Sequence, residues 1–260
     1  MSKLFVSKRT RAAAWVILLV LPALMVAFGY YHSHRPAVNP VGSRTFWDYI
    51  ILNSDILLGL LFLLASAIPF ILVFDKKKPQ ARELVPIAVM AAIAVVGRTV
   101  FEIIPLPNFK PCSAIIIITA VAFGPEAGFM VGAVSALASN FFYGQGAYTP
   151  WQMFAYGAGG MLAGFLFAKN RLPKKPVVMG VFGFLAVLLF VGPLLDTCTV
   201  FLTLPVINAQ TAWPLYVSGF PVNLSQGLCT LLTMLLFGKP LLEKLDRVKL
   251  QYGMGEDDGV

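Results

Sequence analysis

Residues 84 to 104 read "LVPIAVMAAIAVVGRTVFEII", a run that is apolar except for Arg98, Thr99 and Glu102 near its end. It is long enough to cross the hydrocarbon layer of a bilayer as a helix, which takes about 20 residues. The whole chain has the same character, since its 260 residues are 58% hydrophobic and only 12% charged. A soluble domain carries about 25% charged residues and could not bury this much apolar surface. The sequence therefore predicts an integral membrane protein.

Seven further apolar runs bring the predicted number of transmembrane helices to eight. They cover residues 12–31, 56–74, 113–123, 127–142, 151–168, 177–204 and 216–237. The first run is too long for a typical signal peptide and lacks a small-residue cleavage site, so it is predicted to be retained. The run from residue 113 is short and is expected to be tilted or extended by its flanks. Pro193 should kink the run from residue 177. The predicted fold is an all-α bundle without an internal repeat.

Basic residues predict how these spans are oriented. Sixteen of the 20 Lys and Arg residues form four clusters, at residues 3–11, 76–82, 169–175 and 239–249. With eight spans all four clusters lie on one side, which the positive-inside rule makes cytoplasmic. Both termini would then be cytoplasmic, and residues 143–151 and 205–214 would face outward, with the segments around His32 and Asn108. The net charge of +8 thus reports membrane orientation and not a nucleic-acid-binding face.

Ionisable residues inside the predicted spans are candidate binding residues, because they are costly in lipid unless they face protein or water. Arg98 and Glu102 are four residues apart on one helical face, so Glu102 is the nearest candidate partner of Arg98. This pair could line a binding site or form an internal salt bridge that braces the bundle. Asp196 follows Pro193 and could accept hydrogen bonds from a ligand or mark the emergence of the helix into water.

Metal, redox and catalytic motifs receive little support. His32 and His34 form an HxH, but no further Cys or carboxylate ligands accompany them, so a solvated loop is favoured over a metal site. The three cysteines, Cys112, Cys198 and Cys229, lack metal-ligand spacing and are expected to pack as apolar residues. We find no Walker sequence and no Ser/His/Asp or HExxH arrangement, so neither an enzyme nor a resident cofactor is predicted.

Two further features of the sequence are informative: closely spaced small residues in the spans, and the loop at residues 143–151. Ala88 and Ala92 form an AxxxA that lets another helix approach closely, and Gly157, Gly160 and Gly164 are expected to serve packing within the bundle. Residues 143–151 combine aromatic side chains with "GQG". Such a loop can be mobile when empty and packed over a ligand when full. An aromatic belt at the membrane interface would explain Trp151, but not the Gly-Gln-Gly.

Residues 84 to 238 resemble the substrate-binding S component of energy-coupling factor (ECF) vitamin transporters. The resemblance rests on the six-span core, the AxxxA, the "PNFKP" loop and the run "AFGPEAGFMVGAVSALASNFFYGQGAYTPWQMFAYGAGGMLAG". It divides the chain into two extra N-terminal helices (1–75), a basic cytoplasmic connection (76–83), the core (84–238) and a cytoplasmic tail (239–260). The two extra helices depart from the six-helix plan of the family and are not explained by it.

The resemblance implies a subunit of an importer in the bacterial cytoplasmic membrane. An S component binds a vitamin from outside, docks on a shared membrane subunit driven by two ATPase subunits, and releases the vitamin inside. Ala88 and Ala92 would be docking residues. Two outer loops, residues 105–111 and 143–152, would form a lid. The lid sequence favours cobalamin or a related corrinoid, with riboflavin, queuosine-type and pantothenate-type substrates left open.

The predicted substrate-binding residues come from these loops and from the polar positions of the spans. They are Arg98, Glu102, Asn108, Lys110, Asn140, Tyr143, Gln145, Tyr148, Trp151, Gln152 and Asp196. Two other classes of protein stay open: a ligand-free membrane assembly partner and a secondary transporter that works alone. The latter would need a coupling-ion site and usually inverted repeats, and the sequence suggests neither.

Overall fold

The computed structural model describes residues 81–146, 148–167, 171–204 and 207–251, with the isolated positions 23, 46, 47 and 49. The two predicted N-terminal helices, both termini and the two histidines lie outside the described residues. The described part of the chain therefore comprises the predicted six-helix core and part of the tail.

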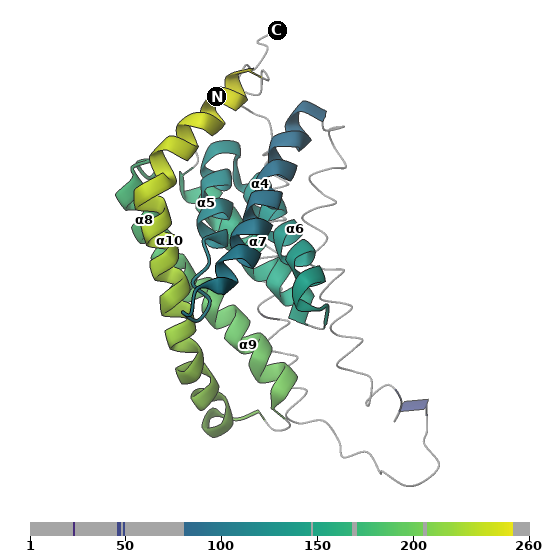
Figure 1. Ribbon diagram of the computed structural model, residues 1–260. Coiled ribbons are helices and arrows are strands. Elements are labelled where there is room, and N and C mark those ends of the chain that lie inside the picture. The colour runs from purple at the N-terminus through teal and green to yellow at the C-terminus, as the bar shows by residue number, and fades with distance from the viewer. Residues whose placement is uncertain are drawn as a thin grey trace.

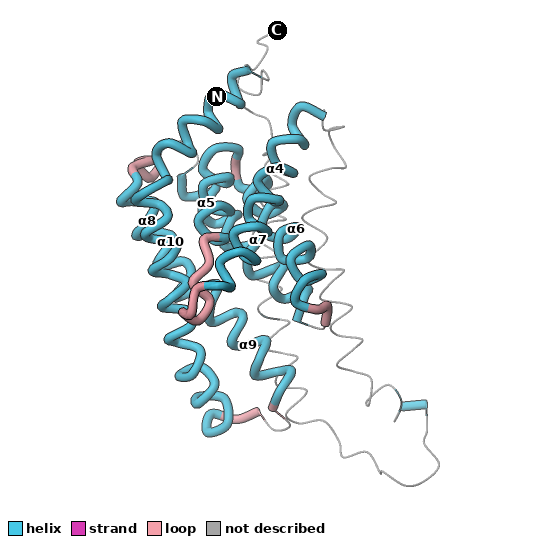
Figure 2. Tube along the Cα trace, in the orientation of Figure 1, coloured by secondary structure: helices cyan, strands magenta, loops and turns pink. Residues whose placement is uncertain are grey.

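The described residues are helical, with short connections (Figures 1 and 2). The helices are α4 (Ala81–Thr99), α5 (Cys112–Phe123), α6 (Pro125–Tyr143), α7 (Tyr148–Phe167), α8 (Pro176–Ala186), α9 (Gly192–Thr203) and α10 (Ala209–Gln251). Two short segments complete them: η1 (Val100–Ile103), a 3₁₀ turn, and η3 (Val187–Val191), a π-helical turn. This part of the chain contains no strand, which confirms the predicted all-α fold.

Three of the described helical segments are long and apolar enough to cross a membrane. They are Leu84–Ile103, Pro176–Thr203 and Ala209–Gln251, and α5 is a shorter apolar helix. The last predicted span, residues 216–237, lies within a longer helix, because α10 begins at Ala209 and continues past Phe237 to Gln251. Its 43 residues rise about 64 Å, twice the roughly 30 Å hydrocarbon layer. The predicted tail is rich in Leu, Lys, Glu and Arg, which favour helix, so its first part extends α10.

The helix type changes just before Pro193, whereas the predicted kink stays a prediction. The π-helical turn η3 ends at Val191, and Pro193 is the second residue of α9, which begins at Gly192. Proline has no N–H, and its ring clashes with the carbonyl group four residues earlier. A π-helical turn has i→i+5 hydrogen bonds in place of i→i+4, so the helix can continue past the proline. The segment 176–203 therefore remains one helical path.

Glycines bring α6 and α7 into backbone contact. A Cβ at Gly132 would lie 2.6 Å from the Tyr156 carbonyl oxygen, and one at Gly160 would lie 2.5 Å from the Gly128 carbonyl oxygen. At Gly164 it would collide with the backbone of Pro125. These approaches confirm that the glycines of residues 157–164 serve packing within the bundle. The two helices form a close-packed hairpin that fixes the polar residues beside its connecting loop.

The described basic segments gather at one end of the bundle. The first residue of α8 follows Lys175, and the Lys249 ammonium donates to the Ala122 carbonyl at the end of α5, 3.3 Å away. Figure 1 shows the start of α4 and the end of α10 at this same end. We call it the basic end, and the opposite end, with residues 104–111 and 143–148, the loop end. Which side of the membrane each end faces stays a prediction.

Candidate functional site

Arg98 is the centre of a polar cluster buried between α4, α6 and α7. Its side chain comes from the last turn of α4, and the residue is only 9% exposed. One terminal nitrogen donates to Ser139 Oγ at 2.5 Å and Asn140 Oδ1 at 3.3 Å. The other donates to Gln152 Oε1 at 3.1 Å. We call Arg98, Ser139, Asn140 and Gln152 the arginine cluster.

The α6–α7 hairpin pre-orients the acceptors of the arginine cluster. The Asn140 amide donates to Gln152 Oε1 at 2.8 Å and to Thr149 Oγ1 at 3.0 Å. Gln152 Oε1 therefore accepts hydrogen bonds from both Asn140 and Arg98. Ser139 and Asn140 are fully buried. Side chains held by several bonds in a dry interior keep a single geometry, which is what a selective binding site requires.

Glu102 does not pair with Arg98, so that expectation is wrong. Its carboxylate forms a salt bridge with Lys110 instead, and the Tyr143 hydroxyl lies 3.0 Å from Glu102 Oε2 and 2.7 Å from the Arg98 carbonyl oxygen. The helix changes to 3₁₀ geometry at Val100, so Glu102 no longer sits one α-helical turn beyond Arg98. The side chain of Glu102 is 58% exposed, whereas Arg98 points into the bundle.

The loop after α6 closes on itself through its own side chains. Gln145 donates to the Leu137 carbonyl at 3.0 Å and accepts from Thr149 at 2.9 Å. Tyr148 donates to the Gly144 carbonyl at 2.6 Å. Gly144 has φ 96°, a conformation that favours glycine. Through Thr149, which also binds Asn140, the loop is tied directly to the arginine cluster.

A second polar cluster joins the other loop to α10. Gln226 is fully buried, and its amide donates to Ser113 Oγ at 3.0 Å and to Tyr156 Oη at 3.1 Å. Its carbonyl accepts from the Asn108 amide at 2.8 Å. We call Asn108, Ser113, Tyr156 and Gln226 the glutamine cluster. Tyr156 connects the two clusters, because the Arg98 guanidinium lies 5.6 Å from its ring centroid.

Comparison with known proteins agrees with this arrangement. The family described as "ECF-type riboflavin transporter, S component" matches residues 78–243. The chain belongs to this family. A UPF0397 protein of Vibrio atlanticus (strain LGP32) is 30% identical over 118 residues, which are 44% of this chain and 64% of that relative. The match thus spans less than two thirds of the relative's length. No solved structure matches the chain.

Family membership confirms the resemblance found in the sequence and sets the general role. S components of ECF transporters are multi-pass proteins of the cell membrane, and the apolar helices of the described residues agree with this. S components bind small vitamin substrates and pair with energising and ATPase modules, and they are transport subunits and not enzymes. Family membership does not identify the substrate or the partner subunits of this chain.

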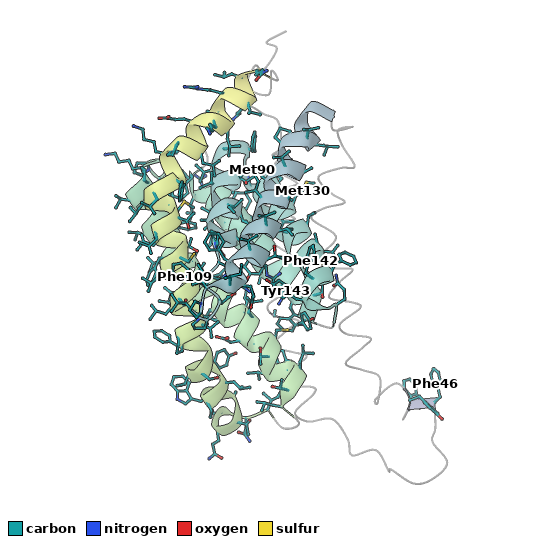
Figure 3. The ribbon with its side chains drawn as sticks, in the orientation of Figure 1. Phe46, Met90, Phe109, Met130, Phe142 and Tyr143 are labelled. Carbon is teal, nitrogen blue, oxygen red and sulfur yellow. The ribbon has the colours of Figure 1, made fainter. Side chains whose placement is uncertain are left out.

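The structure brings most of the predicted site residues of this S component together at the loop end. Arg98, Asn140 and Gln152 form one network, which continues through Tyr143 to Glu102 and Lys110. Figure 3 shows Tyr143 on the α6 side of the loop end and Phe109, next to Lys110, on the α10 side.

Two other predicted residues, Trp151 and Asp196, make contacts in other parts of the bundle. Trp151 is buried, 5.5 Å from the Phe201 ring, in an apolar cluster. Asp196 accepts a hydrogen bond from Asn223 at 2.7 Å, across α9 and α10. Gly219 lies so close to the Asp196 carboxylate that a Cβ there would collide with it. Asp196 is thus held by α10.

Sequence reasoning missed Gln226, Tyr156, Ser113 and Ser139. The prediction rests on charged residues within the spans and on residues in or beside the outer loops, and it does not include these four. A usable signal was present, because an amide within the apolar run 216–237 must find partners in the membrane interior. Asn223 and Gln226 are three residues apart and therefore share a helical face. Among the described residues, no group of three or more His, Cys, Asp and Glu could hold a metal ion.

Proposed function

We propose that this S component captures a vitamin at the loop end, between the arginine and glutamine clusters, and delivers it by docking on an ECF membrane subunit driven by two ATPase subunits. The single observation that carries the substrate site is the buried Arg98 guanidinium, whose three hydrogen bonds all go to neutral oxygens. Glu102, the acid predicted to balance the charge of Arg98, forms a salt bridge with Lys110 instead.

A buried cation without a directly paired anion is electrostatically costly. An electron-rich substrate oxygen, such as a phosphodiester, carboxylate or amide carbonyl oxygen, would stabilise the guanidinium when it replaced one of the internal acceptors. Asn140 and Gln152 could at the same time exchange their hydrogen bond with each other for bonds to the substrate. Aromatic faces from Tyr143 and Tyr156 flank the same space, and both lie within cation–π distance of Arg98.

Two substrates fit this chemistry. The sequence of the 143–151 loop favours a corrinoid, whose amide fringe and phosphodiester suit amide side chains beside an arginine. The matching family is named for riboflavin, and a flavin offers imide oxygens and a flat ring for the tyrosines. We keep the corrinoid as the first substrate to test and riboflavin as the second.

The proposed docking residues lie on the exposed side of α4, whereas Arg98 is buried against α6 and α7. Ala88 and Ala92 are exposed, whereas Ala91 and Ala94 are buried in the core. The exposed face also carries Val89, half exposed. Small side chains between larger apolar ones form a surface on which another helix can pack closely. This arrangement supports a division of α4 into a substrate face and a docking face.

Optical absorbance of the purified full-length chain tests the substrate first. A corrinoid gives a red protein and a flavin a yellow one, and titration of each compound into the protein should then give a saturable signal. A colourless protein that binds neither compound would contradict both substrates. Copurification of ATPase subunits from the native membrane would support the docking proposal, whereas their absence together with a bound solute would favour a transporter that works alone.

A substitution at the proposed docking residues should separate substrate binding from uptake. Ala92→Trp should abolish uptake and leave substrate binding by the isolated protein near normal, because an indole cannot fit a close helix–helix contact far from the loop end. Ala88→Trp should behave alike. Val89→Ala, on the same exposed face, keeps the surface small and should transport normally. Loss of binding in both Trp variants would mean that these alanines pack the bundle itself.

A further inference from the structure

The S component has a groove on its lateral surface, separate from both polar clusters. It has a volume of about 480 Å³. One wall comes from Phe101, Phe109 and Ile115, at the η1–α5 connection, and the other from α10 between Cys229 and Lys244. Leu236 and Phe237 line the groove and are 67% and 58% exposed, so the groove opens to the side of the bundle.

The groove has the length and chemistry of a site for a hydrocarbon chain. From Cys229 to Lys244 the helix rises about 22 Å, since each residue adds roughly 1.5 Å. One leaflet contributes about half of the roughly 30 Å hydrocarbon layer, so an acyl chain fits within the groove. Apart from Thr233 and Lys244, its lining side chains are apolar or sulfur-bearing. An apolar depression open to the bilayer gives water no polar partners, so hydrocarbon fills it more favourably.

Charge is placed at one end of the groove. Lys244 is exposed and closes the groove toward the basic end. Arg247 is exposed three residues further on and shares this helical face. The nearby acidic residues do not cancel them: Glu243 pairs with Lys239, and Asp246 lies two residues from Lys244, on the far side of the helix. The occupant that matches a long apolar groove with a cationic end is an anionic phospholipid.

We propose that this groove binds one acyl chain of an anionic phospholipid, with the phosphate headgroup held by Lys244 and Arg247. The site is independent of the substrate site, because none of its lining residues belongs to the arginine or glutamine cluster. The lipid would cover exposed apolar side chains of α10, among them Leu236 and Phe237. It would also tie the basic end of α10 to the membrane surface.

The test uses the full-length chain reconstituted in nanodiscs with equal amounts of phosphatidylglycerol and phosphatidylcholine. After transfer to mild detergent, native mass spectrometry counts the lipids that stay bound. We expect retained phosphatidylglycerol, and about a fivefold loss in Lys244→Gln, the effect of one basic residue on an anionic lipid. Lys239→Gln is the matched control, since Lys239 is also basic and on α10 but does not line the groove.

A second pair of variants tests the hydrocarbon part. Thr233→Trp fills the groove and should reduce retention of both lipids, whereas Leu235→Trp, on a face of α10 outside the groove, should not. Equal retention of the two lipids, or equal loss in Lys244→Gln and Lys239→Gln, would overturn the headgroup site. Unchanged retention in Thr233→Trp, verified as folded by a thermal melt, would overturn the groove as the binding place. Lys244 is exposed, so Lys244→Gln still tests the proposal if Thr233→Trp misfolds.

Discussion

The two polar clusters at the loop end are built on different supports. The arginine cluster lies on the α6–α7 hairpin, whose backbones touch through glycines, and it contains a buried charge. The glutamine cluster is neutral and connects a loop residue, Asn108, to helices α5, α7 and α10. A close-packed hairpin holds its side chains in one geometry, whereas the loop 104–111 is held through side-chain contacts, from Asn108 to α10 and from Lys110 to Glu102 and Tyr143, and such a loop can open. We infer that the arginine cluster recognises the substrate and the glutamine cluster controls access to it.

The largest effect is expected from disrupting the close α6–α7 contact that supports the arginine cluster. Gly132→Ala places a methyl group against the Tyr156 carbonyl oxygen, and backbone cannot move aside as a side chain can. Such overpacking costs about 3 kcal/mol or more, so the melting temperature should fall steeply and substrate binding should fail. Gly238→Ala is the control, because its nearest new contact, at 3.4 Å, is the end of the flexible Met179 side chain. Equal melting temperatures for the two variants would show that the hairpin tolerates separation.

The next effect tests recognition by Arg98 itself. Arg98→Lys keeps the charge but loses the planar fork of donors that reaches Ser139, Asn140 and Gln152 together. A buried charge-assisted hydrogen bond contributes roughly 1.5–3 kcal/mol, so affinity should fall by about ten- to a hundred-fold while the protein stays folded. Titration of the substrate into both proteins, with a thermal melt of each, makes the measurement.

A purely structural arginine gives the opposite pattern. Arg98→Lys would then bind the substrate with normal affinity, and only Arg98→Ala would fail, through lost expression or stability. That outcome would remove Arg98 from the recognition site and leave the arginine cluster as a brace between α4, α6 and α7.

A smaller effect is expected in the glutamine cluster. Gln226→Leu removes the partner of the Asn108 amide and of the Ser113 and Tyr156 hydroxyls. Buried polar groups left without partners cost about 1–3 kcal/mol of stability. The neighbouring Ser225→Ala is the control, because the Ser225 hydroxyl has no hydrogen-bond partner among the described residues. If both variants melted at the same temperature, the glutamine cluster would contribute nothing to holding the loop.

Some of the residues in these predictions could be identified from the sequence, and others could not. The helices of the core followed from apolar runs, and Arg98 from the cost of a charge in lipid. The pairing of Glu102 with Lys110 could not be foreseen, because it depends on the switch from α to 3₁₀ geometry at Val100. The glutamine cluster joins residues more than a hundred positions apart, and one sequence gives no measure of such contacts. The extension of α10 to Gln251 was missed because hydropathy locates the membrane span and not the helix end.

The smallest effect concerns the hold of the loop on α10. Asn108 has φ 52°, in the left-handed region that asparagine and glycine tolerate, and its amide donates to Gln226. Asn108→Gly keeps the backbone free to adopt this conformation and removes only the hydrogen bond, which contributes about 0.5–1.5 kcal/mol. The dissociation constant should therefore rise by roughly two- to tenfold. A loop that opens more often should release substrate faster, so the change should appear in koff and leave kon nearly unchanged.

Asn108→Ala separates the hydrogen bond from the backbone conformation. Alanine loses the same bond, and a left-handed backbone costs it about 1–2 kcal/mol more, so it should release substrate faster than Asn108→Gly. Stopped-flow measurement of release from the three proteins gives the order directly. Wild-type release rates in both variants would mean that residues 104–111 do not limit access. The glutamine cluster would then not control access, and substrate would have to leave past residues 143–148, which are tied to the arginine cluster through Thr149.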